Sequence, residues 1–190
     1  MSIHEDRSEV LLGGVEKVEI RIDEYDLSWV SRYRDHEARI STALSNEALR
    51  IEHIGSTAVE GMAAKPIVDV LLVVADSGDE AAYLPKLEVV GYELRVREPD
   101  FHEHRMLRTR DRSVHVHVLS AGSPEVARCL ALRDALRGSA AERELYAETK
   151  RKLAARDWAN MNAYADAKSE VIEAILIRAQ DILAKPPLHR

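Results

Sequence analysis

The chain has 190 residues, 32% of them charged, and its formal net charge at pH 7 is −6. These values favour one folded domain, residues 1–190, and argue against non-specific nucleic-acid binding, which needs a basic surface. The single cysteine, Cys129, excludes an intramolecular disulfide, and no apolar run approaches the ~18 residues that a membrane span needs.

The first residues of the chain are polar. The segment MSIHEDRSEV lacks the basic start and the apolar core of a signal peptide, so we expect a cytoplasmic protein with a loose segment at residues 1–16. Residues 17–22 alternate between polar and apolar side chains, which predicts a short strand. Apolar and aromatic side chains then recur at helical spacing, which predicts a helix over Ser28–Leu44.

The middle of the chain is dominated by strand patterns. Residues 48–55 form the next predicted strand, and the nearly continuous apolar run at residues 67–74 predicts a buried one. A helix is predicted over residues 79–90, with Gly91 as its stop signal. Three further strands are predicted at residues 92–99, 103–109 and 113–120. Residues 17–122 are therefore expected to form an α/β core.

The character of the chain changes from residue 123, and residues 123–185 are predicted to be helical. One helix opens on Ser123-Pro124, and the next opens on Ser139 with Glu142 three residues later, which is a capping-box pattern. A third, long helix is predicted over residues 158–184. The expected fold class is α+β: a mixed sheet of about five strands followed by an all-helical C-terminal half.

A carboxylate in the buried strand points to function. Asp69 lies within the apolar run, where an ionised side chain is costly unless it is paired or bound to a metal. A Gly-Ser-Thr turn, formed by Gly55, Ser56 and Thr57, precedes it, and such a turn offers backbone N–H groups to a phosphate. Lys65 lies between the turn and the strand, where it can reach a phosphate or pair with Glu60.

This spacing resembles the polymerase-β-like nucleotidyltransferase superfamily, in which Gly-Ser, a short helix and a strand carrying Asp follow each other. The longer string HIGSTAVEGMAAKPIVDVLLVV closely resembles the signature of the GrpB family, a branch of that superfamily. The likeness continues through REPDFHEHRM, VHVHV, LRDALR, LYAETKRKLA and YADAKSEVI, from about residue 20 to residue 179. It implies a nucleotidyltransferase fold that binds a nucleotide or another phosphorylated small molecule. As an enzyme, such a protein would transfer a nucleotidyl group to an acceptor that the sequence does not identify.

The chain departs from the superfamily at one position. Leu71 stands where a second metal-binding carboxylate is usual, and leucine offers no oxygen to Mg²⁺. The superfamily's third carboxylate comes from a later strand, which resembles VHVHV. Alternation places His115 and His117 of this strand on the face away from its valines, together with Asp69. We expect Asp69, His115 and His117 to bind a divalent metal, with Zn²⁺ or Mn²⁺ favoured over Mg²⁺. Alternatively the histidines are hydrogen-bonded without a metal.

Catalytic roles are assigned to Asp69 and His117, with His117 as a candidate general base. A further histidine, His104, is expected directly opposite His117 on the neighbouring strand if the connection turns near residues 110–111. A slip of one residue would put Arg105 there instead.

Three basic residues of the helical half are candidate phosphate ligands. Lys150 and Lys168 each follow a tyrosine by four residues, and Arg133 precedes Asp134. Alternatively, Asp134 locks its helix to the sheet through an ion pair.

The second functional hypothesis is a non-catalytic ligand-binding or helper module. GrpB-like domains resemble this chain and also occur fused to dephospho-coenzyme A kinase. Leu71 favours this reading, whereas the Gly-Ser-Thr turn, Lys65 and Asp69 favour a working pocket. Nothing in the sequence indicates an oligomeric state.

Overall fold

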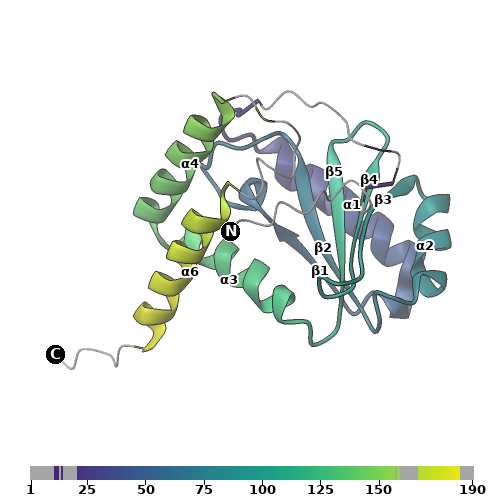
Figure 1. Ribbon diagram of the computed structural model, residues 1–190. Coiled ribbons are helices and arrows are strands. Elements are labelled where there is room, and N and C mark those ends of the chain that lie inside the picture. The colour runs from purple at the N-terminus through teal and green to yellow at the C-terminus, as the bar shows by residue number, and fades with distance from the viewer. Residues whose placement is uncertain (1–10, 13, 15–20, 157, 159–166, 185–190) are drawn as a thin grey trace.

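The computed structural model describes residues 11–12, 14, 21–156, 158 and 167–184. Its centre is a five-stranded sheet with the strand order β1-β2-β5-β4-β3 (Figure 1). β2 and β5 are parallel, and the other neighbouring strands are antiparallel. The strands are β1 (Arg50–Ile54), β2 (Val68–Val74), β3 (Tyr92–Glu98), β4 (His104–Thr109) and β5 (Val114–Ser120). The predicted mixed sheet is therefore confirmed, with Asp69 on the interior strand β2.

One face of the sheet packs against two helices, α1 (Ser28–Leu44) and α2 (Glu80–Val89). The bounds of α1 are those predicted from its periodicity. Every second side chain of β2 and β5 points into this main core, so that Val114, Val116 and Val118 are fully buried. The prediction that the valines face the core is confirmed.

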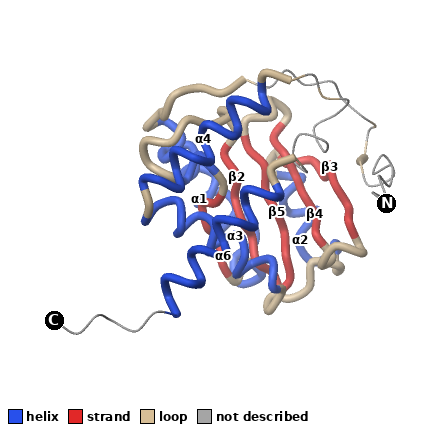
Figure 2. Tube along the Cα trace, turned by 60° about the vertical axis from the view of Figure 1, so that its left-hand side comes forward, coloured by secondary structure: helices blue, strands red, loops and turns tan. Residues whose placement is uncertain are grey.

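The other face of the sheet is covered by the C-terminal helices, as Figures 1 and 2 show. These are α3 (Pro124–Gly138), α4 (Ala140–Ala154) and α6 (Ser169–Ala184). In Figure 2, α3 and α6 cross in front of β2 and β5. Two short 3₁₀ turns complete the described elements, η2 (Ser45–Glu47) and η3 (Ser56–Ala58). Among the described residues, no helix is both long enough and apolar enough to cross a membrane.

The helical half begins its first two helices as predicted. The Ser123 hydroxyl accepts a hydrogen bond from the Glu125 N–H, and the Ser139 hydroxyl accepts one from the Glu142 N–H. Only half of the expected capping box is found, because the Glu142 carboxylate turns to Arg178 of α6 at 2.6 and 2.7 Å. The same carboxylate therefore holds two helices together.

The first strand prediction is only partly covered by the structure. Residues 17–20 lie outside the described residues, and Arg21 and Ile22 are not in a strand. Asp23 forms an isolated antiparallel bridge with Ala64 instead. The predicted strand is therefore not found at Arg21 and Ile22, and its first four residues are not tested.

The two ends of the chain also differ in part from expectation. Leu11 bridges Val96, and Leu12 donates to the Arg95 carbonyl, so these two residues are held against β3 rather than loose. The predicted third helix is described only from Ser169 onward, because residues 157 and 159–166 lie outside the described residues.

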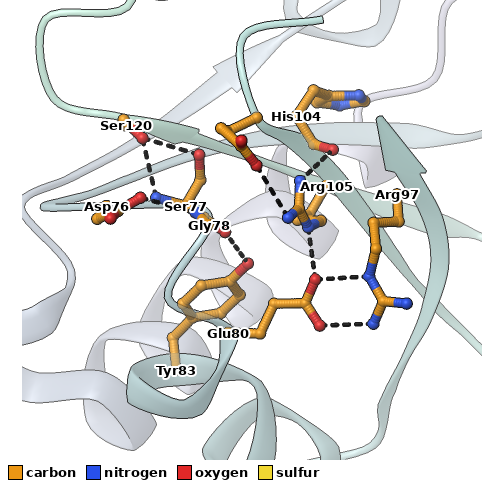
Figure 3. Close-up of polar contacts among 10 residues, drawn as sticks. Asp76, Ser77, Gly78, Glu80, Tyr83, Arg97, His104, Arg105 and Ser120 are labelled. Carbon is orange, nitrogen blue, oxygen red and sulfur yellow. Dashed lines mark hydrogen bonds and ion pairs between the residues drawn. The ribbon is translucent and has the colours of Figure 1, made fainter. Parts of the chain in front are cut away.

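A partly buried ion-pair network fixes α2 to the far edge of the sheet (Figure 3). The Glu80 carboxylate, at the start of α2, receives two hydrogen bonds from Arg97 of β3, at 2.7 and 2.6 Å. Arg105 of β4 donates a third at 2.6 Å and is only 4% exposed. The network sets the position of β4, and Figure 3 shows that the ring of the adjacent His104 points away from it.

Candidate functional site

A cavity of about 340 Å³ lies on the sheet face that carries Asp69. All the predicted site residues except Arg133 line it: Gly55, Ser56, Thr57, Lys65, Asp69, His115, His117, Lys150 and Lys168. Cys129 also lines it, but burial raises the pKa of this thiol to about 12, so it is not a thiolate nucleophile near neutral pH.

The turn that enters the cavity is shaped around the carboxylate. Gly55 follows β1 with φ +68°, a conformation that favours glycine. A Cβ at this position would lie 2.5 Å from Oδ2 of Asp69. Ile54 and Asp69 are backbone partners in the β1–β2 ladder, which brings the turn and the carboxylate together. Gly55 is therefore required by both its backbone and its neighbour.

Asp69 and the two histidines converge on one point. The parallel pairing of β2 and β5 sets Asp69 beside His115 and Leu71 beside His117. Oδ1 of Asp69 lies 3.4 Å from Nε2 of His117 and 3.7 Å from Nδ1 of His115. One ligand atom from each residue lies within 4.8 Å of the others. The geometric part of the prediction is confirmed, and the metal-binding and catalytic roles stay predictions.

The electrostatics of this cluster suit a cation. Burial opposes the charge on Asp69, but the contact with His117 and the nearby His115 and Lys168 hold the pKa of this carboxyl below the ordinary value. Burial lowers the pKa of His115 to about 4, despite the favourable charge of Asp69. Near neutral pH, an ionised carboxylate thus faces a neutral imidazole, which is a form in which both groups can bind a metal.

His104 reaches His117, but not by the predicted register. Met106, not His104, is the backbone partner of His117. Because side chains two residues apart share a face, the His104 ring still stacks on that of His117, with centroids 5.3 Å apart. Nε2 of His104 lies 3.1 Å from Nδ1 of His117, and Nδ1 of His104 lies 2.7 Å from Oε2 of Glu98. Burial lowers the pKa of His104, although Glu98 opposes this.

Three lysines face the cluster across the cavity. Lys150 of α4 donates to Oγ of Ser56 at 2.9 Å and to the Ala63 carbonyl at 2.7 Å, and it is 3% exposed. Burial and the neighbouring Lys168 lower its pKa to about 7. The same two causes lower the pKa of Lys65 to about 8, and burial also lowers that of Lys168. Such crowded, desolvated ammonium groups favour an anion.

Arg133 does not line the cavity. Its guanidinium donates to Glu52 of β1 at 2.7 Å, to Asp134 at 2.8 Å and to the His53 carbonyl at 3.2 Å. These contacts link α3 to the sheet through Arg133 and not through Asp134, as the alternative expected, and the phosphate contact of Arg133 stays a prediction. The link runs from Arg133 to Glu52, whereas Asp134 is mostly exposed.

Sequence reasoning missed two residues that support the site. His53 is buried, stacks on Tyr33 with centroids 4.6 Å apart, and its Nε2 lies 3.0 Å from Oγ1 of Thr57. The sequence feature that could have indicated a role for His53 is its position just before the Gly-Ser-Thr turn. Glu98, beside His104, gave no local signal, because only the pairing of β3 with β4 brings these two side chains together.

The family of the chain follows from its comparison with known proteins. The model of the GrpB family, described as GrpB protein, matches residues 19–178. The chain belongs to the GrpB family. A UPF0157 protein of Streptomyces coelicolor is 49% identical, covering 89% of both chains. Another, from Halalkalibacterium halodurans, is 46% identical, covering 92% of this chain and 91% of the relative.

Solved structures extend the comparison to the fold. The crystal structure of the conserved protein GrpB from Enterococcus faecalis is 30% identical with a TM-score of 0.76, covering 87% of this chain and all of that one. The Cid1 poly(U) polymerase, 13% identical, has a TM-score of 0.51 over 70% of this chain and 44% of the polymerase. The fold of this GrpB chain is therefore similar to that of nucleotidyltransferases.

One relative is a larger protein. The dephospho-CoA kinase of Mycobacterium leprae is 31% identical over 75% of this chain, and the match spans 42% of that kinase.

Proposed function

We propose that the cavity binds a phosphate-bearing small molecule of the nucleotide class. The observation that carries this proposal is the convergence of Lys65, Lys150 and Lys168 on one cavity, with Lys150 hydrogen-bonded to Ser56. Ammonium groups with pKa values lowered by burial and mutual repulsion gain most from an anion that neutralises them. The phosphates would lie between the Gly-Ser-Thr turn and the lysines.

The fold supports nucleotidyl transfer as the reaction, because a polymerase that uses nucleotides has a similar one. An acceptor oxygen would attack the α-phosphorus of a nucleoside triphosphate, the bond to the bridging oxygen would break, and pyrophosphate would leave. The lysines would stabilise the charge that builds on the phosphates. The acceptor's proton needs a base, and His117 is the candidate if its Nε2 is not bound to a metal.

Calorimetric titration with nucleoside triphosphates tests the binding. Lys150→Met keeps most of the buried stem but removes the ammonium group, so we expect affinity to fall about 10- to 100-fold, the worth of a hydrogen bond to a charged group. Ser56→Ala should weaken binding less. Lys152→Met is the matched control, because Lys152 lies on the same helix, is exposed and pairs only locally with Glu148. Equal affinities of wild type, Lys150→Met and Lys65→Met would refute the phosphate pocket.

A second candidate is a non-catalytic module that senses or presents a ligand, such as the substrate of a kinase. Leu71 favours it, because this fully buried leucine occupies the place of the usual second carboxylate. The similarity to part of a dephospho-CoA kinase names a ligand to test, dephospho-CoA. Tight binding of dephospho-CoA without release of pyrophosphate from any nucleotide would favour the module over the transferase.

A further inference from the structure

The two-magnesium arrangement of nucleotidyltransferases does not fit this cavity. Leu71 packs with Ile54, Val73 and Leu119 in an apolar cluster beside α3, so the face of β2 offers one carboxylate and not two. The groups that replace it are imidazoles from β5, within 4.8 Å of Asp69. Mg²⁺ prefers oxygen ligands in an octahedral arrangement, whereas imidazole suits transition metals.

We propose that Asp69, His115 and His117 bind a single divalent transition-metal ion, and that Glu98 and His104 form a positioning chain that presents the Nε2 lone pair of His117 to it.

Hydrogen-bond accounting along this chain supports the proposal. A neutral imidazole has one N–H and one lone pair, and an ionised carboxylate can only accept. With an ionised Glu98 carboxylate and two neutral imidazoles, Nδ1 of His104, 2.7 Å from Glu98, carries the hydrogen. Nε2 of His104 is then an acceptor, so Nδ1 of His117, 3.1 Å away, must donate to it. Nε2 of His117 is left with a bare lone pair.

This lone pair points at another acceptor. Nε2 of His117 lies 3.4 Å from Oδ1 of Asp69, which is longer than a well-formed hydrogen bond. Two lone pairs that face each other repel unless a cation lies between them. Ligands about 2.0–2.1 Å from a tetrahedral Zn²⁺ are separated by about 3.3 Å, so the observed spacing suits a shared ion. Nδ1 of His115 lies 3.7 Å from the same oxygen, and the ligand atoms of all three residues lie within 4.8 Å of one another.

The chain behind His117 has the form of a metal-site support. Histidines that bind metals donate their other ring N–H to a partner, which fixes the tautomer and the ring orientation. Here the partner is His104, itself held by Glu98, and the side chains of both are largely buried at 12% and 17% exposure. Stacking at an interplanar angle of 15° further restricts the two rings. The fourth position would face the cavity, where a phosphate oxygen or water can bind.

Titration of the full-length protein with Co²⁺ at neutral pH, followed by Zn²⁺ competition, tests the site. Co²⁺ gives visible absorption bands that report its coordination. We expect one ion per chain, displaced by Zn²⁺, and loss of the bands in His117→Ala and His115→Ala. The titration contains no phosphate compound, so its failure would leave the proposed nucleotide binding standing.

The positioning chain is tested with variants that do not remove a ligand. Glu98→Gln weakens the acceptor for His104, and His104→Phe keeps a stacked ring but removes the acceptor for His117. We expect metal affinity to fall about 10- to 100-fold in each, the usual cost of losing such support. His102→Ala is the control, because His102 lies on the turn before β4 and is not part of the Glu98–His104–His117 series. Absence of Co²⁺ binding by the wild type would overturn the metal site, and unchanged affinity in both variants would overturn the positioning role.

Discussion

Gly55 and Asp69 show how a single backbone position controls the site. Strand β1 is followed by Gly55, which has a positive φ and lies directly against the Asp69 carboxylate. A side chain there would displace the group around which the histidines and lysines are arranged. The glycine therefore has two separable functions, one in the backbone and one in leaving room for the carboxylate.

A pair of alanine variants separates these two functions. Gly61 has φ +73°, close to that of Gly55, but a Cβ at Gly61 would meet nothing within 4 Å. Gly61→Ala should cost about 1–2 kcal/mol from the left-handed backbone alone. Gly55→Ala should cost at least about 1 kcal/mol more, because of overpacking against Asp69. Urea unfolding measures the free energy of unfolding of both variants. Equal losses would mean that the Asp69 side chain moves away from the new Cβ without an energetic cost.

The lysines make ligand binding depend on pH in a defined direction. Without a ligand, burial lowers the pKa of Lys150 to about 7 and that of Lys65 to about 8. A bound phosphate favours the charged forms and raises both pKa values, so the protein should take up protons on binding between about pH 7 and 9. Affinity should therefore fall as pH rises through this window.

Calorimetry in buffers of different ionisation enthalpy measures this uptake directly. At pH 8 we expect roughly one proton per bound triphosphate in the wild type, and clearly fewer in Lys150→Met. Proton release, or uptake that is the same in the variant, would contradict the assignment of Lys150 to the phosphate pocket.

Sequence alternation was enough to place Asp69, His115 and His117 together, because period-two geometry fixes the face of every side chain in a strand. It was not enough for His104 and Glu98. Their contact depends on the registers of β4 with β5 and of β3 with β4, and the β3–β4 pairing shifts between Leu94 and Val96. Register is a property of the folded sheet, set by turns and by packing of both faces.

The elements themselves were largely predictable where periodicity was strong. Helix α1 and strands β2 and β5 follow from spacing alone, and the starts of α3 and α4 follow from Ser123 and Ser139. The exact partner of a long side chain was not predictable, because it depends on which elements meet in space. Arg133 is the example: its partner Glu52 lies 81 residues away on β1.

The Arg133–Glu52 link should support the docking of α3 rather than ligand binding. Arg133→Met leaves Glu52 without one of its two arginine partners, so we expect a loss of about 1–3 kcal/mol in the free energy of unfolding. Arg178→Met, which breaks the more exposed pair with Glu142, should cost less than about 1 kcal/mol.

Arg133→Met also tests the phosphate contact that the sequence predicts for Arg133. Nucleotide affinity measured by calorimetry should be unchanged in Arg133→Met, in contrast to Lys150→Met. A tenfold or greater loss of affinity in a folded Arg133→Met protein would return Arg133 to the phosphate pocket.

Among the described residues, the sheet and the helical half share two hydrophobic clusters. Leu71 and Leu119 of the sheet pack with Val126 and Leu130 of α3. A second cluster joins Val59, after the Gly-Ser-Thr turn, to the C-terminal helices through Leu136, Tyr146 and Ile175. The cavity touches both clusters, because its lining includes Ile54 of the first cluster and Leu132, which packs against the second. Neither half can bury its apolar surface, or complete the cavity, without the other.

This shared burial predicts a single cooperative unfolding transition, which is what one domain over residues 1–190 would show. Each half contains one tryptophan: Trp29 is buried on α1, and Trp158 donates to the Leu153 carbonyl at the end of α4. In Trp158→Phe, fluorescence reports the sheet half, and in Trp29→Phe it reports the helical half. In each variant the urea midpoint by fluorescence should coincide with that by far-ultraviolet circular dichroism.

A ligand that fills the cavity should shift both midpoints together, because it stabilises only the complete fold. A helical half that unfolds at lower urea than the sheet would show that the two halves are separate domains, and the cavity would then be an interface between them.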